Sequence, residues 1–207
     1  VIKAKNSKKP IVAFYNSIAA SGGYYVSVPA DKIIATPATW TGSIGVIMQV
    51  PNFSGLMSKV GLQMVTIKSG KSKDTLSPYR PTTEEDQEIF QKLVDESYEQ
   101  FVQIVSKGRK MNLQKARALA DGRIYSAKQA RENGLIDKVG YFEDAVEMAQ
   151  KLSGFKDASP VEIQEKRGFT NMFSEKINRL EKILSNLFPK PGLYYLDNTL
   201  LMMSEKR

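Results

Sequence analysis

The fold is decided by residues 11–25, which read IVAFYNSIAASGGYY. The continuous apolar run over 11–15 is typical of a buried strand. The small residues that follow predict a sharp turn at Ser21 and a short helix over 24–27, which Pro29 ends. A buried strand that leads through a tight turn into a helix indicates an α/β fold.

Short strands and helices alternate along the rest of the chain. Apolar runs and turns predict strands over 32–35 and 63–67, a turn over 41–45, an apolar run over 46–48 and a helix over 53–60. Capping-box spacing of Thr82 and Glu85 predicts the start of a long helix. Further helices are expected over 113–120 and over 143–152 with Gly154 as the stop. Another is expected to open at Ser126, with Gln129 at capping-box spacing three residues on, and to close at Gly134. This alternation supports an α/β core.

The composition excludes several kinds of chemistry. The chain has 207 residues and no histidine or cysteine, which rules out a Ser-His-Asp triad, a thiol nucleophile, a thiolate zinc site and disulfides. A general base must then be Asp, Glu, Lys or Tyr. We expect no metal and no cofactor.

The charge and the chain start suggest where the protein acts. The formal charge is 30 − 22 = +8, but lysines alternate with acids and form no basic stripe with aromatic residues, so we expect no nucleic-acid partner. No apolar run reaches the ~18 residues that span a bilayer. The chain enters a strand soon after Val1, so we expect an upstream part, with a membrane anchor, before it.

Ser21 is the candidate nucleophile. A sharp strand-to-helix turn with small neighbours exposes a serine hydroxyl and lets a substrate backbone approach. The N–H of Gly22, at the start of the helix, is a natural donor to a developing oxyanion. The alternative is a tight turn in which Ser21 only caps the helix.

A lysine has to act as the base if Ser21 is a nucleophile. The loop over 68–74 carries Lys68, Lys71 and Lys73, whose mutual repulsion would favour a neutral amine. An ordinary lysine has a pKa of ~10.4, so its neutral form costs ~4–5 kcal/mol at pH 7. The alternative is a solvated loop without chemistry.

Four segments resemble motifs of the signal peptide peptidase A family, also called protease IV. They are SIAASGGYY over 17–25, TGSIGV over 41–46, IKSGKSKD over 67–74, and DGRIYSAKQA over 121–130 followed by GLID over 134–137. Their order is similar to that of the compact bacterial form of the family, and the resemblance covers residues 8–155.

The resemblance implies a fold, a mechanism and a set of partners. The fold would be an α/β superhelix of the ClpP/crotonase type. Ser21 would be the nucleophile, Lys73 the general base, and Ser43 would orient Lys73. Substrates would be signal peptides and other membrane-associated peptides, cut at the extracytoplasmic face of a bacterial cell membrane by a ring-shaped homo-oligomer. A glycine-rich segment upstream of Val1 would supply the second oxyanion donor, so the isolated chain is expected to be an incomplete catalytic domain.

Other residues are assigned to the substrate site or to the core. We expect Gly23, Gly45, Val46 and Ile47 to contact substrate, although the apolar run over 46–48 also suits a buried strand. Trp40 could floor a pocket or pack in a turn. The aromatic residues between 14 and 25 are expected in the core.

The chain divides at residue 155. Residues 1–155 would form the Ser/Lys peptidase domain, and residues 156–207 a C-terminal extension. Apolar residues in the extension step by 4, 3, 4 and 3 along an amphipathic helix, at Phe173, Ile177, Leu180, Leu184 and Leu187. The apolar tail that follows, LYYL over 193–196, could lie in the substrate groove as a self-inhibitory strand.

Two other functions compete with the peptidase. A crotonase-like acyl-CoA enzyme would use the same fold with catalytic acids and would leave the serine and lysine idle. A non-catalytic assembly module would keep the motifs without turnover. Fold alone does not choose among them.

Overall fold

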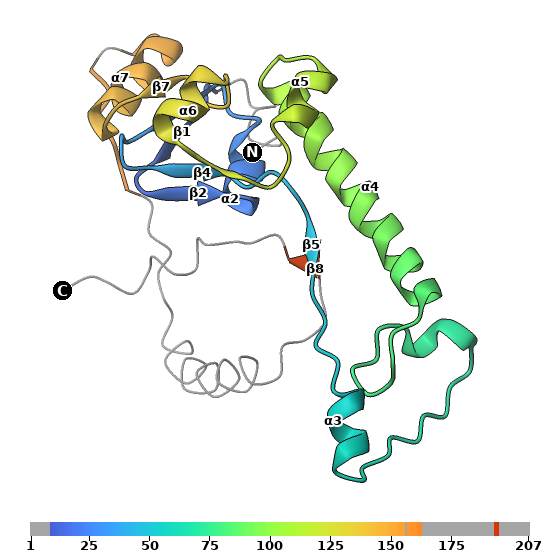
Figure 1. Ribbon diagram of the computed structural model, residues 1–207. Coiled ribbons are helices and arrows are strands. Elements are labelled where there is room, and N and C mark those ends of the chain that lie inside the picture. The colour runs from blue at the N-terminus through green and yellow to red at the C-terminus, as the bar shows by residue number, and fades with distance from the viewer. Residues whose placement is uncertain (1–8, 156, 163–192, 195–207) are drawn as a thin grey trace, which may run out of the picture. The chain divides into compact units, whose positions relative to one another are not determined.

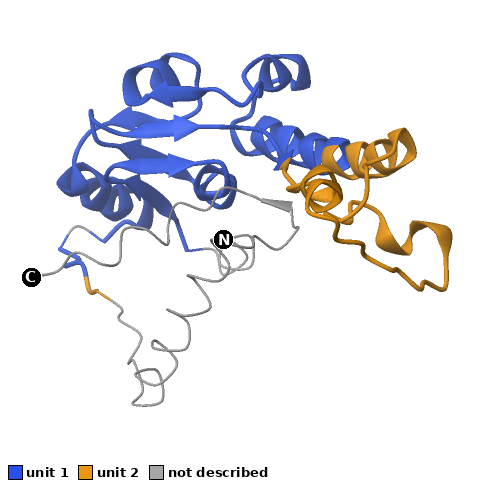
Figure 2. Cartoon of the chain, turned by 60° about the horizontal axis from the view of Figure 1, so that its bottom comes forward, with its two compact units in different colours: residues 1–47, 95–160, 194–207 blue, residues 48–94, 161–193 orange. Residues whose placement is uncertain are grey.

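The computed structural model describes residues 9–155, 157–162 and 193–194. These residues fall into two compact units, which are described separately (Figure 2). Unit 1 contains residues 9–47, 95–155, 157–160 and 194. Unit 2 contains residues 48–94, 161–162 and 193.

Unit 1 contains a parallel sheet built on the apolar run at the start of the chain. Strand β1 (Val12–Tyr15) pairs with β3 (Lys32–Ala35), and β3 pairs with β7 (Lys138–Val139). The predicted strands at 11–15 and 32–35 are therefore confirmed. The order β1-β3-β7 places β3 at the centre, and its residues Ile33, Ile34 and Ala35 are fully buried.

A second sheet in unit 1 was not predicted, and it carries the candidate nucleophile at its end. Strand β4 (Trp40–Gly42) pairs in parallel with β2 (Ile18–Ala20) and antiparallel with β6 (Ile124–Ser126). The residues predicted as a turn over 41–45 therefore begin inside a strand. Strands of three residues are too short for an alternating pattern to reveal them.

Unit 1 also contains helices that follow its strands in the chain (Figure 1). They are α2 (Gly22–Ser27), α5 (Leu113–Ala118), α6 (Ala127–Glu132), α7 (Phe142–Ser153) and the later part of α4 (Glu84–Gly108). The predicted capping box of Ser126 and Gln129 is confirmed, and Gly154 ends α7 in the left-handed region at φ 79°. Tyr15 and Tyr24 are buried in the core with Phe101 and Ile136, as expected of the early aromatic residues.

Unit 2 holds α3 (Ser54–Lys59), the 3-10 helix η1 (Lys71–Asp74) and residues 84–94 of α4. Two predictions here are wrong. Residues 63–67 form no strand, because nothing in the described part of the chain pairs with them. The capping box of α4 is formed by Thr83 and Asp86: Thr83 N–H donates to Asp86 Oδ2 (3.0 Å) and Asp86 N–H to Thr83 Oγ1 (3.2 Å). Helix α4 thus begins one residue later than Thr82 and Glu85 predicted.

The predicted α/β fold class is confirmed. Strand β5 (Ile47–Met48) and β8 (Leu193–Tyr194) form a two-stranded sheet. The amphipathic helix expected over 173–187 lies outside the described residues. The division at residue 155 and the ClpP/crotonase superhelix remain to be tested.

Asp137 of the GLID segment ties three parts of unit 1 together. Its carboxylate accepts hydrogen bonds from Arg109 NH1 (2.9 Å), the backbone N–H of Ile33 (2.9 Å) and Lys32 Nζ (3.1 Å). Burial raises the pKa of Asp137, but the hydrogen bonds from Arg109 and Ile33 outweigh burial and hold the pKa below its ordinary value of 3.8. A lowered pKa in the folded state means that this carboxylate stabilises the fold above about pH 4 and less below it.

We therefore expect Asp137→Asn to lower the free energy of unfolding by about 2 kcal/mol at pH 7, because Arg109 loses its charged partner. The difference from wild type should shrink as the pH falls below about 4, because the wild-type carboxylate then also takes up a proton. Chemical unfolding at pH 7 and pH 3 measures both effects. The exposed Asp157→Asn is the control. An equal loss at both pH values would contradict the assigned role of the charge.

Candidate active site

Ser21 occupies a strained turn between β2 and α2. Its backbone angles are φ 51° and ψ −113°, a region that serine seldom adopts and that costs about 1–3 kcal/mol. Its N–H donates to Gly42 O (2.8 Å), and its carbonyl accepts the first helical hydrogen bond, from Tyr25 N–H (2.8 Å). The Ser21 side chain does not cap the helix. The sharp turn is confirmed, and Ser21 occupies the N-cap position of α2 without a side-chain capping hydrogen bond.

The turn does not expose Ser21 as the sequence predicted. The residue is only 3% exposed in the described chain. The hydrogen bond to Gly42 explains the difference, because it draws the turn against the end of β4.

Ser43 follows β4 at the same edge of the sheet. Ala20 is the register partner of Gly42 in the parallel pair of β2 and β4, so Ser21 and Ser43 are the next residues on the two neighbouring strands. Both have positive φ, at 51° and 48°. Two motifs that are far apart in the sequence therefore meet, because the carboxyl ends of parallel strands share one edge.

The DGRIY segment braces this edge. Ser43 N–H donates to Arg123 O (2.8 Å) and Gly122 N–H to Ile44 O (3.1 Å). Gly42 lies at φ 85°, and a Cβ there would come within 2.5 Å of the Tyr125 ring. The fourth motif thus has a structural role: it fixes the loop that carries Ser43.

The remaining residues assigned to the oxyanion or substrate site lie at the start of α2 and between β4 and β5. Gly22 and Gly23 begin α2, and the N–H of a first helical residue has no acceptor within the helix. Gly45 lies against the backbone of Gly122, since its Cβ would meet Gly122 Cα at 3.4 Å. Val46 precedes β5, and Ile47 in β5 is 45% exposed. Their contact with substrate stays a prediction.

The lysine loop of unit 2 separates its three cations. Lys68 Nζ pairs with Asp74 Oδ1 (2.6 Å), and Lys71 Nζ pairs with Glu85 Oε2 (2.5 Å). Lys73 follows both in η1, is exposed, and makes no ion pair with any residue in the described ranges. The amine of Lys73 is therefore the one in this loop that a carboxylate does not hold.

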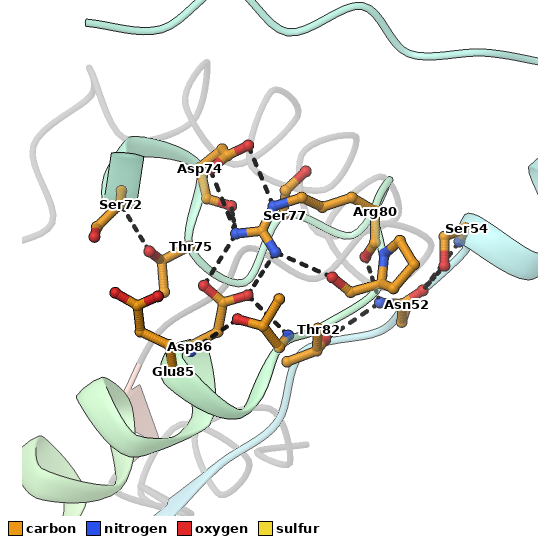
Figure 3. A network of polar contacts seen from close by, with 12 residues as sticks. Asn52, Ser54, Ser72, Asp74, Thr75, Ser77, Arg80, Thr82, Glu85 and Asp86 are labelled. Atoms are coloured by element: carbon orange, nitrogen blue, oxygen red, sulfur yellow. Dashed lines mark hydrogen bonds and ion pairs between the residues drawn. The ribbon is translucent and has the colours of Figure 1, made fainter. Parts of the chain in front are cut away.

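Arg80 fixes the loop to the start of α4, and sequence reasoning missed it (Figure 3). Its guanidinium binds both carboxylate oxygens of Asp86, pairs with Asp74 Oδ2 (3.2 Å) and donates to Asp74 O (3.0 Å). Hydrogen bonds from Lys68 and then Arg80 lower the pKa of Asp74, and those from Arg80 and the Thr83 N–H lower the pKa of Asp86. The residue after Lys73 is thus tied to a helix start.

The signal for Arg80 was weak. Arg80 lies six residues from each aspartate, in a loop without a recognisable motif around it. Asn52 adds a second tie, because its amide donates to Arg80 O (2.8 Å) and its side-chain oxygen accepts from Ser54 N–H (3.0 Å) (Figure 3).

The structure brings Ser21, Ser43 and Gly22 together but does not test their pairing with Lys73. The first three lie in unit 1 and Lys73 lies in unit 2. Among the described residues, no group of three or more acids could hold a metal ion. None of the described helices is both long and apolar enough to cross a membrane.

Comparison with known proteins identifies a peptidase family. The model of peptidase family S49 matches residues 3–156. A protein of Enterococcus faecium named as a signal peptide peptidase, SppA, is 41% identical over 210 residues, which cover 93% of this chain and 61% of that protein.

More distant relatives agree. Protease 4 of Haemophilus influenzae is 32% identical over 178 residues (86% of this chain, 28% of that protein), and the chloroplastic serine protease SPPA of Arabidopsis thaliana is 36% identical over 151 residues (72% and 22%). The chain thus spans 61% or less of the length of these relatives.

Gly42→Ala should disturb the edge that holds Ser21 and Ser43. The new Cβ would meet the Tyr125 ring at 2.5 Å and Arg123 O at 3.0 Å, at a φ of 85°. We expect a loss of about 2–3 kcal/mol in stability, measured by thermal unfolding. Gly55→Ala is the control, because a Cβ there meets nothing within 4 Å in α3, and it should be neutral or slightly stabilising. Equal melting of Gly42→Ala and wild type would show that the edge is not rigid.

Proposed function

The chain belongs to peptidase family S49, and from this premise we propose that it is the catalytic part of a serine endopeptidase in which Ser21 is the nucleophile and Lys73 the general base. The observation that carries the proposal is the strained turn of Ser21, whose N–H is hydrogen-bonded to Gly42, the last residue of β4 before Ser43. Strain of this kind persists only where the surroundings enforce it, and it is concentrated at functional sites.

The proposed reaction is acyl transfer without a metal or cofactor. Neutral Lys73 Nζ takes the proton from Ser21 Oγ, and Oγ attacks the peptide carbonyl carbon. The N–H of Gly22 and a second donor upstream of this chain stabilise the oxyanion. Lys73 returns the proton to the leaving amine, and water then hydrolyses the acyl-serine with the same base.

The ion pairs of the loop favour Lys73 over its neighbours. An amine that is ion-paired with a carboxylate is held at that carboxylate and is less free to approach another group. Lys68 and Lys71 both have such a partner, at Asp74 and Glu85. Lys73 is left to approach Ser21, with the Ser43 hydroxyl as the group that orients its amine.

We extend the proposal to the whole protein. Its substrates would be signal peptides and other membrane-associated peptides, and it would act at the extracytoplasmic face of a bacterial membrane through an upstream anchor. It would assemble as a ring-shaped homo-oligomer on a fold of the ClpP/crotonase type. The name of the relative from Enterococcus faecium supports the substrate class.

The test is hydrolysis of an apolar peptide as a function of pH. It uses this chain and a form extended at the N-terminus to the length of its relatives. Ser21→Ala and Lys73→Met should each lower kcat at least 10³-fold. Wild-type kcat should rise with pH as the base loses its proton, along a profile that reports one basic group.

Lys71→Met is the matched control. It removes a neighbouring lysine whose ion pair with Glu85 is mostly exposed and contributes little to stability, so kcat should stay within about twofold. Retained activity in Lys73→Met would reject Lys73 as the base. No activity in either wild-type form would favour the non-catalytic assembly module.

The tail should compete with substrate. Strand β8 pairs with β5, which contains the assigned substrate residue Ile47. A strand on this edge takes backbone groups that an extended peptide would use. Removal of residues 189–207 should therefore lower KM several-fold and leave kcat nearly unchanged. Steady-state kinetics at low and saturating peptide concentrations measure this. If removal of the tail leaves the rate unchanged both at low and at saturating peptide concentration, the tail does not inhibit the enzyme.

A further inference from the structure

The outer face of the second sheet exposes large apolar side chains. Successive side chains of a strand point to opposite faces. Thr41 and Tyr125 are 0% and 6% exposed and form the inner face. Three side chains point to the opposite face of the sheet. Their exposed fractions are 39% for Ile18, 59% for Trp40 and 49% for Ile124. A sheet that buries one face normally places polar residues on the other, so this apolar outer face needs an explanation.

The three exposed side chains form one patch. Ile18 is the register partner of Trp40 in the parallel pair of β2 and β4. In the antiparallel pair, Trp40 lies opposite Ser126 and Gly42 opposite Ile124, so Ile124 is the diagonal neighbour of Trp40. Diagonal neighbours lie about 7–8 Å apart, within reach of an aromatic ring. We call Ile18, Trp40 and Ile124 the Trp40 patch.

The patch carries no free charge. Its three members are apolar, and the residue across from Trp40 is Ser126. The nearest cation in the sequence, Arg123, donates from Nε to both carboxylate oxygens of Asp121 (2.8 and 2.7 Å). The chemistry of the patch therefore suits an apolar ligand.

The patch lies on the strands that end at the proposed nucleophile. Ile18 is three residues before Ser21, and Trp40 is three residues before Ser43. At about 3.3 Å per residue the patch is roughly 10 Å from the reactive edge. An extended peptide covers this distance with about three residues.

The size of the patch argues against a subunit interface. Three partly exposed side chains offer roughly 300 Å² of apolar surface, whereas a stable dimer buries about 800 Å² on each partner. Two or three side chains of a peptide need no more than this.

We propose that the Trp40 patch is a substrate subsite, which binds the apolar side chains of a peptide about three residues from the cleaved bond. This inference rests on the proposed peptidase function. It makes Trp40 a residue that determines specificity: peptides that are apolar at this distance gain binding free energy, and polar peptides do not.

Trp40 is the only tryptophan of the chain, so its fluorescence reports on the patch without any turnover. In the Ser21→Ala variant of both forms, a ten-residue peptide rich in leucine and valine should cause a saturable blue shift. A peptide of the same length rich in serine and glutamine should cause none. This experiment remains informative even if the wild-type protein shows no activity.

Three results would overturn the proposal. They are an unchanged spectrum with the apolar peptide, a shift that depends on protein concentration without peptide, and a shift with phosphatidylcholine vesicles but not with peptide. The second would assign the patch to a second copy of the chain and the third to lipid.

Kinetics provide the second test. Trp40→Ala should lower kcat/KM for the apolar peptide about tenfold or more and change that for the polar peptide by less than twofold, while Trp40→Phe recovers part of the loss. Phe155→Ala is the control, because Phe155 is 71% exposed in the same unit but follows α7. An equal loss for both peptides, or a loss in the control, would reject a specificity role.

Discussion

The candidate site depends on one hydrogen bond, from the N–H of Ser21 to Gly42 O (2.8 Å). It joins the ends of β2 and β4 at the point where both chains leave regular strand geometry. Ser21, Gly42 and Ser43 all have positive φ, at 51°, 85° and 48°. Two serines in the left-handed region would be unfavourable on their own, so the surrounding contacts must offset the strain.

Those contacts come from the antiparallel strand β6, from the residues before it and from the pairing of β4 with β2. Arg123 O accepts from Ser43 N–H, and Thr41 Oγ1 donates to Ala19 O (2.6 Å). The Tyr125 ring occupies the space that a side chain at residue 42 would need. The segment that begins at Arg123 is 123 − 21 = 102 residues downstream of Ser21, and it braces the end of β4 to which Ser21 is hydrogen-bonded. This explains how a motif to which no catalytic role is assigned can contribute to the site.

The sequence predicted the parts of this arrangement whose signals are local. Strand β1, the turn at Ser21, the capping box of Ser126 and Gln129 and the stop at Gly154 each depend on neighbouring residues, and all are confirmed. The second sheet was missed because three residues are too few to show a period. The exposure of Trp40 was missed for the same reason: without the strand assignment, nothing indicated which face its side chain would take.

Unit 2 shows the opposite limit of sequence reasoning. Its alternating segment over 63–67 remains without a partner strand among the described residues, because alternation signals a strand only where a sheet accepts it. The main polar feature of unit 2 is a network of ion pairs in a loop. The ion pairs of Arg80 with Asp74 and Asp86 leave no periodic pattern in the sequence from which they could be predicted. The network nevertheless has a chemical consequence. By holding Lys68 and Arg80 beside Asp74, it occupies the carboxylate next to Lys73 and leaves the Lys73 amine available. Under the proposed function, this binding of Asp74 elsewhere leaves the Lys73 amine free to approach Ser21.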